Sequence, residues 1–309
     1  MAVLGLGLAA LGRPGYSTLG HAGDFPSTDP ADMERQAHAV LDCAYANGIR
    51  HIDTARSYGR GEQFLASWLQ KRKPQDVFVS SKWGYRYTAD WQRTAAVHEV
   101  KEHSLEHFEQ QWAESKAILG PWLKLYQIHS ATFESEVLDD SDILLRLFRL
   151  RKETGVKIGA TVTGVKQPAL LHRIYMLISG EEEDQIFDWV QATWNVLLQH
   201  AGGALLAAHS NSANVIIKEA LAGGRLSSRG NHARWLEMAA DLRVTPDALA
   251  LGIALEQPFA DVVLSGAATV AQLESNLKAR EVKAGSLPWR ELEEDPEVYW
   301  ATRAKLPWT

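Results

Sequence analysis

Cysteine is nearly missing from the sequence: Cys43 is the one thiol among 309 residues. One thiol builds neither a disulfide framework nor a cysteine metal cluster, so we expect a reducing compartment, the cytoplasm. The sequence also lacks an apolar run of the roughly 18 residues that a membrane span requires. Its apolar start, residues 2–11, has no basic segment before it and is interrupted by Gly5 and Gly7, which argues against a signal peptide.

An excess of positive charge is missing as well. The 32 Lys and Arg residues are outnumbered by 38 Asp and Glu residues, which gives a formal net charge of −6. Without a basic block, neither nucleic acid nor an anionic membrane surface is an expected partner. The remaining composition, with 46% hydrophobic and 23% charged residues, is that of a globular protein with a large core. No pattern in the sequence indicates the oligomeric state.

Short apolar runs typical of β-strands alternate with helical periodicity along the chain. After an apolar, glycine-rich first segment at 2–11, strands are predicted at 50–54, 76–82, 124–129, 156–161, 185–193, 214–218 and 261–264. Helices are predicted at 32–46, 61–70, 97–118, 142–153, 167–177, 201–208, 233–241, 246–256 and 270–278. A doubly wound sheet gives the same alternation, but about eight strands favour a (β/α)8 TIM barrel. We expect one domain, 1–309, with residues 281–309 as a C-terminal extension that carries Trp289, Trp300 and Trp308.

Four polar side chains lie where the chemistry of such a barrel is found, at the carboxyl ends of the strands and in the loops after them. Asp53, Lys82 and His129 end predicted strands, and Tyr58 follows the first of these. A nearby ammonium lowers the pKa of a phenol, a carboxylate holds the ammonium in position, and an imidazole orients a carbonyl oxygen. The set therefore suits proton delivery to a carbonyl oxygen while a hydride reaches the carbon.

Each of the four residues also fits a plain structural role when it is taken alone. Asp53 and Lys82 would form a buried ion pair between adjacent strands, since both types are seldom buried without a partner. Tyr58 would be a surface tyrosine before a glycine turn, and His129 a core histidine whose ring nitrogens have hydrogen-bond partners. Their convergence on one end of the predicted barrel favours the chemical interpretation.

Three segments carry a family resemblance: HIDTARSYGRGE at 51–62, SSKWG at 80–84 and YQIHS at 126–130. In this order and context they resemble the aldo-keto reductase superfamily, and the likeness extends from LGLG near the start to GAATVAQLESNL at 266–277. The resemblance implies a TIM barrel and nicotinamide-dependent reduction of an aldehyde or ketone, or the reverse oxidation. It assigns Tyr58 as the proton donor, supported by Asp53, Lys82 and His129.

The same resemblance implies a nicotinamide dinucleotide, NADP(H) with NAD(H) as the alternative. The positions that it assigns to cofactor binding are Thr161, Gln191, Leu221, Gly223, Gly266, Ala267, Gln272 and Asn276. Gln272 also fits a purely structural role as a helix cap, because Thr269 and Gln272 have the spacing of a capping box. Relatives with a clear NADPH preference place Lys or Arg at the 2′-phosphate, whereas this chain has Gly266 and Gln272 at those positions. Arg280 is the alternative partner for the 2′-phosphate.

This chain departs from the family pattern after the seventh strand of the predicted barrel. The family often has an aromatic residue there that stacks on the nicotinamide, whereas this chain has Lys218 followed by Glu219. A carboxylate beside a pyrophosphate is unfavourable unless it turns away. Trp83 and Trp91 are candidate walls of the substrate pocket, although aromatic residues fit a core equally well.

Two other functions remain open. The first is a non-catalytic nucleotide-binding regulatory protein of reductase fold, which the altered Lys218–Glu219 region would suit. The second is a zinc-dependent hydrolase, because His103 and His107 form an H-x-x-E-H pattern on a predicted helix, with Glu181–Glu183 as an unanchored source of a third ligand. The catalytic set argues for the reductase and no metal is predicted. A G-x-G-x-x-A run at Gly5 is rejected as a dinucleotide fingerprint, because no helix follows it.

Overall fold

Eight parallel strands of the computed structural model, which describes residues 2–178 and 185–309, close into a barrel. In barrel order they are β1 (Val3–Gly7), β10 (Val262–Ser265), β9 (Asn214–Lys218), β8 (Trp189–Thr193), β7 (Lys157–Val162), β6 (Leu123–Ala131), β3 (Phe78–Trp83) and β2 (His51–Asp53). All of these pairings are parallel, including the pairing of β1 with β10 that closes the ring. The predicted (β/α)8 TIM barrel is therefore confirmed.

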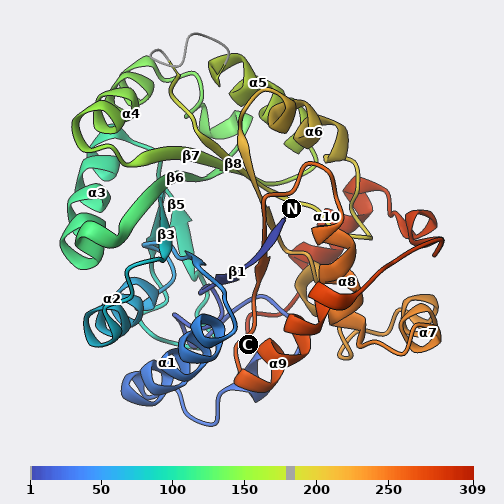
Figure 1. Cartoon of the computed structure of the whole chain (residues 1–309). Helices are drawn as coiled ribbons and strands as arrows, with labels where there is room; N and C mark the ends of the chain where they lie inside the picture. The colour runs from blue at the N-terminus through green and yellow to red at the C-terminus, as the bar shows by residue number, and fades with distance from the viewer. Residues whose placement is uncertain (1, 179–184) are drawn as a thin grey trace.

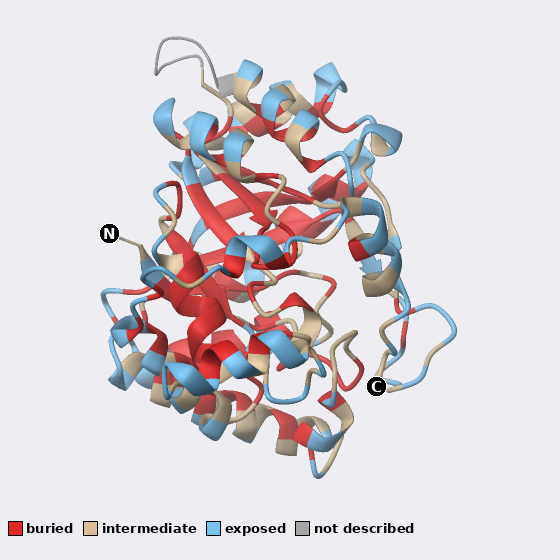
Figure 2. Cartoon of the chain, turned by 90° about the vertical axis from the view of Figure 1, so that its right-hand side faces the viewer, coloured by how far each residue is buried: buried red, intermediate tan, exposed pale blue. Residues whose placement is uncertain are grey.

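Helices surround the barrel (Figure 1). They are α1 (Pro30–Ala46), α2 (Gly61–Arg72), α3 (Leu105–Leu119), α4 (Ser141–Thr154), α5 (Gln167–Ile178), α6 (Gly202–Ser210), α7 (Ala233–Asp241), α8 (Pro246–Leu255), α9 (Val270–Leu277) and α10 (Pro296–Ala304). Figure 2 shows buried strands inside and exposed outer faces on the helices. None of the helices in the described ranges is long and apolar enough to cross a membrane.

Alternation along the strands separates an inner from an outer face, because successive side chains of a strand point to opposite sides. Leu125, Ile216, Val262 and Leu264 form a buried cluster of their own, with Phe78 and Trp189 packed against it. These six residues come from five strands of the barrel, so we take the cluster as the filling of its interior. Residues two and four positions further along the same strands then point inward at the carboxyl end, where the candidate site lies.

The segment between β3 and α3 differs from the prediction. A helix was expected over 97–118, but β4 (Tyr85–Tyr87) and β5 (Glu99–Lys101) form an antiparallel hairpin, and α3 begins at Leu105. Ser104 is the residue that starts this helix, because its side chain accepts a hydrogen bond from the backbone N–H of His107. The hairpin brings Glu99 and Lys101 to the barrel mouth.

Two deeply buried histidines make the stability depend on pH. Burial lowers the pKa of both His21 and His51 to about 4. An unfolded histidine binds a proton near pH 6.5, whereas these two stay neutral in the folded protein until about pH 4. The unfolded state therefore binds more protons between these values, and folding stability is lost as the pH falls through this window.

We expect the thermal unfolding midpoint to fall as the pH is lowered from 7 toward 5. Replacing His51 with phenylalanine should weaken this dependence, because the ring contacts with Phe78 and Trp189 remain available while the titrating group is gone. Scanning calorimetry across the pH range measures both slopes. Identical slopes for the native protein and His51→Phe would contradict the assignment.

Candidate active site

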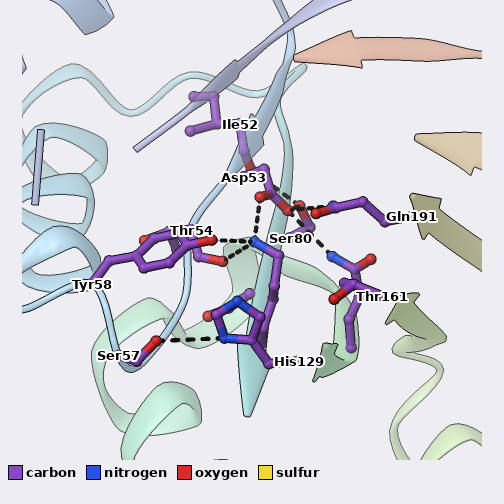
Figure 3. Close-up of polar contacts among 12 residues, drawn as sticks. Ile52, Asp53, Thr54, Ser57, Tyr58, Ser80, His129, Thr161 and Gln191 are labelled. Atoms are coloured by element: carbon purple, nitrogen blue, oxygen red, sulfur yellow. Dashed lines mark hydrogen bonds and ion pairs between the residues drawn. The ribbon is translucent and has the colours of Figure 1, made fainter. Parts of the chain in front are cut away.

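The carboxylate of Asp53 is the centre of a buried hydrogen-bond network at the end of β2 (Figure 3). Its Oδ1 accepts hydrogen bonds from Ser80 Oγ at 2.6 Å, Gln127 Nε2 at 3.2 Å and Gln191 Nε2 at 3.3 Å. Its Oδ2 pairs with the Lys82 ammonium. Side chains from β3, β6 and β8 therefore bind the one carboxylate at the end of β2. These hydrogen bonds and the ion pair offset the cost of burying its charge away from water.

Lys82 connects this network to the phenol of Tyr58. Its Nζ contacts Asp53, donates a hydrogen bond to the carbonyl oxygen of Thr54 at 2.9 Å, and reaches the Tyr58 hydroxyl at 3.4 Å. The ammonium also lies 4.9 Å from the centroid of the Tyr58 ring. Three of the four residues predicted to act together thus form a chain of direct contacts, carboxylate to ammonium to phenol.

The phenol of Tyr58 is held protonated. Burial raises its pKa well above 10, and the nearby Asp53 carboxylate raises it further, while the Arg13 guanidinium opposes the rise. The sequence led us to expect a lowered phenol pKa beside the ammonium, but the net direction in this structure is upward. Burial is the largest cause, and the Asp53 carboxylate acts in the same direction as burial.

His129 completes the predicted group from the end of β6. Its ring packs edge-on against Tyr58, with 5.5 Å between centroids, and against Tyr85 at 4.9 Å. The Ser57 hydroxyl lies 3.4 Å from Nδ1. Burial, with the positive charges of Lys82 and Lys218 as the next causes, lowers the pKa of His129 well below 6.5. The imidazole is therefore neutral at physiological pH, so a carbonyl oxygen beside it would meet a hydrogen-bonding group without a further charge.

Arg13 covers the other face of Tyr58. Its guanidinium carbon lies 5.1 Å from the centroid of the Tyr58 ring, 5.3 Å from that of Tyr16 and 4.9 Å from that of Trp308. It also binds the carboxylate of Glu99 at 2.7 Å. The C-terminal residues reach this place because Trp308 forms a β-bridge with Ser17. Trp308, from the C-terminal extension, thus lies against the arginine that covers Tyr58.

Gly12 sets the position of the loop that carries Tyr58. A Cβ atom at residue 12 would lie 2.3 Å from the backbone oxygen of Tyr58 and 2.7 Å from Cα of Gly61. We expect Gly12→Ala to shift this loop, to lower stability by about 1–3 kcal/mol through overpacking, and to reduce kcat. Gly23→Ala is the matched control, because nothing lies within 4 Å of its Cβ position. Denaturant unfolding and steady-state kinetics measure both variants, and equal behaviour of the two would contradict this expectation.

The predicted cofactor positions follow consecutive strands of the barrel. Thr161 and Gln191 are near the ends of β7 and β8, which are neighbours, and Thr161 Oγ1 accepts a hydrogen bond from the Ser130 N–H at 2.7 Å. Leu221 and Gly223 follow β9, and Gly266 and Ala267 follow β10. Gln272 and Asn276 lie on α9. All eight positions therefore occur along one side of the mouth, on β7 to β10 and the segments that follow them.

The start of α9 is tied to two distant loops. Thr269 caps the helix by accepting the Gln272 N–H, which is one half of the suggested capping box; the Gln272 Oε1 accepts the N–H of Ala268 at 2.8 Å, one residue before the N-cap. Its Nε2 also donates to Asp24 Oδ1 at 2.7 Å. The Asp24 carboxylate is paired with Arg229, from the segment between β9 and α7. Arg229 and Asp24 were not singled out from the sequence.

Glu219 is paired with an arginine of α10. Its carboxylate accepts hydrogen bonds from Arg303 of α10, from Nε at 2.8 Å and from Nη2 at 2.6 Å. This ion pair and the neighbouring Lys218 hold the pKa of Glu219 below its usual range although burial acts in the opposite direction. The repulsion expected between Glu219 and a pyrophosphate is therefore reduced, because α10 supplies a counter-charge.

The structure gives Trp83, Trp91 and Arg280 contacts that the sequence did not indicate. Trp83 points to the outer face of β3, is 0% exposed and packs on Phe108, so it is a core residue rather than a wall of an open pocket. Trp91 donates from Nε1 to the carbonyl oxygen of Thr28 at 2.7 Å and holds the hairpin segment against that loop. Arg280 donates to the carbonyl oxygen of Asn47 and is engaged at the end of α1.

The zinc pattern is not assembled. His103 lies before Ser104 and therefore outside α3, and its Nε2 is 3.0 Å from the carbonyl oxygen of His129. The two imidazoles are thus not one turn apart on a helix, as the H-x-x-E-H interpretation required. Across the described ranges, no group of three or more His, Cys, Asp and Glu side chains is placed to hold a metal ion. Glu181–Glu183, the suggested third ligand, lie outside the described residues.

Several contributors to the site were missed from the sequence. Ser80 and Gln127 lie two positions before Lys82 and His129 on the same strands, so alternation alone would have placed them inside the barrel. Arg13 and Arg303 carry no such signal, because they reach the site from the segment after β1 and from a helix near the end of the chain.

A closed parallel barrel that gathers its ionisable side chains at the carboxyl ends of the strands is the architecture of TIM-barrel enzymes. The chain belongs to the aldo/keto reductase family, whose model matches residues 4–294, and it is an oxidoreductase. This confirms the resemblance drawn from the sequence motifs.

Individual relatives are distant in sequence. The chain is 24% identical over 269 residues to the oxidoreductase YqkF of Bacillus subtilis (strain 168), covering 80% of this chain and 82% of YqkF. Among solved structures, the holo form of aldo-keto reductase AKR11C1 from Bacillus halodurans superposes with a TM-score of 0.69 at 19% identity, covering 98% of this chain and 92% of AKR11C1. PA4992 from Pseudomonas aeruginosa gives a TM-score of 0.64 at 23% identity, covering 91% and 90%. These likenesses establish the fold.

Proposed function

We propose that this protein is a nicotinamide-dependent oxidoreductase that reduces an aldehyde or ketone to an alcohol, or catalyses the reverse oxidation. The observation that carries the proposal is the contact chain from Asp53 through Lys82 to the Tyr58 hydroxyl, with the neutral His129 ring beside it. A protein that only bound a nucleotide would have no use for a buried proton donor, which disfavours the regulatory alternative.

The residues present fit a nicotinamide dinucleotide. Gly266 borders open space, since no heavy atom lies within 4 Å of its Cβ position, and α9 begins just after it, so backbone N–H groups and the helix dipole are available to a phosphate. Thr161 and Gln191 would hold the nicotinamide end, and Gln272 and Asn276 the adenosine end. We propose NADP(H), with Arg229, which shares Asp24 with Gln272, as the group able to pair with a 2′-phosphate.

When bound, this cofactor would supply a hydride to the carbonyl carbon. Tyr58 would donate its proton to the carbonyl oxygen, and His129 would orient that oxygen by a hydrogen bond. Lys82 would stabilise the phenolate that forms, and Asp53 would keep the ammonium in place. A high phenol pKa does not prevent this step, because the alkoxide that forms is a stronger base than a phenolate. The high pKa also keeps the proton on Tyr58 across the physiological pH range.

The experiment begins with quenching of the intrinsic fluorescence of the 11 tryptophans by NADPH and by NADH. A panel of aldehydes and ketones is then tested with the nucleotide that binds, by following its oxidation. Sustained, carbonyl-dependent oxidation supports the proposal. Tight nucleotide binding without turnover of any carbonyl or alcohol would favour the regulatory alternative. Tighter binding of NADH than of NADPH would overturn the cofactor assignment alone.

A further inference from the structure

Lys218 is the last residue of β9, and its side chain points into the barrel mouth. Ile216, two positions earlier, belongs to the cluster that fills the barrel, so the alternation places Lys218 on the same inner face. The register agrees, because Gln191 pairs with Ile216 and Thr193 pairs with Lys218. The ammonium is close enough to Lys82 and His129 for each of these groups to act on its neighbours electrostatically.

Among the residues that the structure describes, the positive charge of Lys218 has no partner of its own. Lys82 is bound to Asp53, Arg13 to Glu99 and Arg303 to Glu219. The neighbouring Glu219 would be the natural partner of Lys218, but its carboxylate is engaged twice by Arg303. Within residues 2–178 and 185–309, the Lys218 ammonium makes neither a hydrogen bond nor an ion pair.

A second polar group beside Lys218 also lacks a hydrogen-bond partner among the described residues. Thr193 is 0% exposed, and its hydroxyl has no hydrogen-bond partner among the described residues. Buried polar groups are normally paired, so an unpaired hydroxyl next to an unpaired ammonium indicates a position completed by a ligand. The ligand must accept hydrogen bonds and carry negative charge, because an isolated ammonium in a partly buried place is costly.

We propose that Lys218 binds an anionic group of the substrate, so that the protein prefers carbonyl compounds that carry a carboxylate or a phosphate over neutral ones. This inference rests on the proposed function and deepens it by naming the substrate class. A cavity of about 350 Å³ between the segments after β6 and β7 and helix α10 lies close by, since Arg303, which binds Glu219, lines it. It offers room for the remainder of such a substrate.

The kinetic test uses carbonyl compounds in matched pairs. The pair 4-oxobutanoate and butanal examines a carboxylate, and the pair glyceraldehyde 3-phosphate and glyceraldehyde examines a phosphate. We expect the native protein to prefer one or both anions. Lys218→Met should raise KM for the preferred anion roughly 10- to 100-fold, with little effect on the neutral partner, because a charge-assisted hydrogen bond is lost. Lys218→Arg should keep most of the preference, and Lys124→Met, which removes an exposed lysine from the start of β6, should keep all of it.

The preference should also fall at alkaline pH. Burial lowers the pKa of Lys218 to about 8, and the positive charges of Arg303 and Lys82 lower it further. The carboxylates of Glu219 and Asp53 oppose this shift. The neighbouring His129 ring is neutral and adds no charge. KM for the anionic substrate should therefore rise above about pH 8, whereas KM for the neutral partner should not. The rise should be absent in Lys218→Met.

Binding without turnover separates failure of this inference from failure of the proposed function. Butanoate and inorganic phosphate have no reducible carbonyl, and calorimetry should show that the ion of the preferred class binds the native holoprotein and not Lys218→Met. Equal binding by both, or by neither, would overturn the inference. So would carbonyl turnover without preference for either anion, or a Lys218→Met variant that weakens nucleotide binding and leaves the preference intact. Absence of any carbonyl turnover would count against the proposed function alone.

Discussion

Replacing Tyr58 with phenylalanine is expected to reduce kcat for carbonyl reduction by about 10³-fold, within the range of 10²–10⁴ typical of a general acid. The hydroxyl is the atom that Lys82 contacts at 3.4 Å, and phenylalanine removes it while keeping the ring between Arg13 and His129. Stopped-flow measurement of nucleotide oxidation gives the rate of the chemical step, and fluorescence quenching gives the nucleotide affinity.

The affinity and the unfolding midpoint of Tyr58→Phe should remain close to those of the native protein, since its ring contacts are unchanged. Tyr45→Phe is a matched control, because it removes the hydroxyl of a distant tyrosine that bonds Asp76. A Tyr58→Phe variant with a native rate would show that another group delivers the proton. The mechanism proposed for this site would then be abandoned.

Replacing Lys82 with methionine is expected to lower kcat by about 10²- to 10³-fold and to leave nucleotide affinity nearly unchanged. The ammonium contacts both Asp53 and Tyr58, so its loss removes the charge that would stabilise the phenolate. It also leaves the Asp53 carboxylate buried without its counter-charge, which costs about 3–5 kcal/mol of stability. Pre-steady-state kinetics, nucleotide titration and denaturant unfolding measure the three effects.

A double variant separates the chemical effect of Lys82 from its structural effect. Adding Asp53→Asn to Lys82→Met removes both charges of the ion pair, so it should recover part of the lost stability without recovering the rate. A rate that returned together with the stability would assign Lys82 a structural role. Equal losses of rate and nucleotide affinity in Lys82→Met would also contradict the role proposed for it.

The barrel could be predicted because each strand carries its own signal. Buried parallel strands are short and continuously apolar, as in 214–218, and amphipathic helices with clear caps follow them, as after Asp140 or Thr269. The hairpin of β4 and β5 could not be predicted in this way. Its two short strands are partly exposed and rich in charged and aromatic residues, so neither periodicity dominates.

The candidate site was predictable to the extent that its residues lie on strands. Asp53, Lys82 and His129 occupy strand ends, and closure of the barrel alone brings strand ends together. The direction of the Tyr58 pKa shift was not predictable, because burial is a property of the assembled molecule. Nor was the pairing of Glu219 with Arg303, since these residues meet only when α10 packs beside the mouth.

The buried guanidinium of Arg13 links segments from the two extremes of the chain, since it lies against Tyr16, Tyr58 and Trp308 and pairs with Glu99. Contacts between residues so far apart in the sequence form slowly, because a long loop must close before they stabilise anything. During renaturation from denaturant, circular dichroism should therefore report complete helices before enzymatic turnover reappears. The lag between these two signals would time the arrival of the final segment at Arg13.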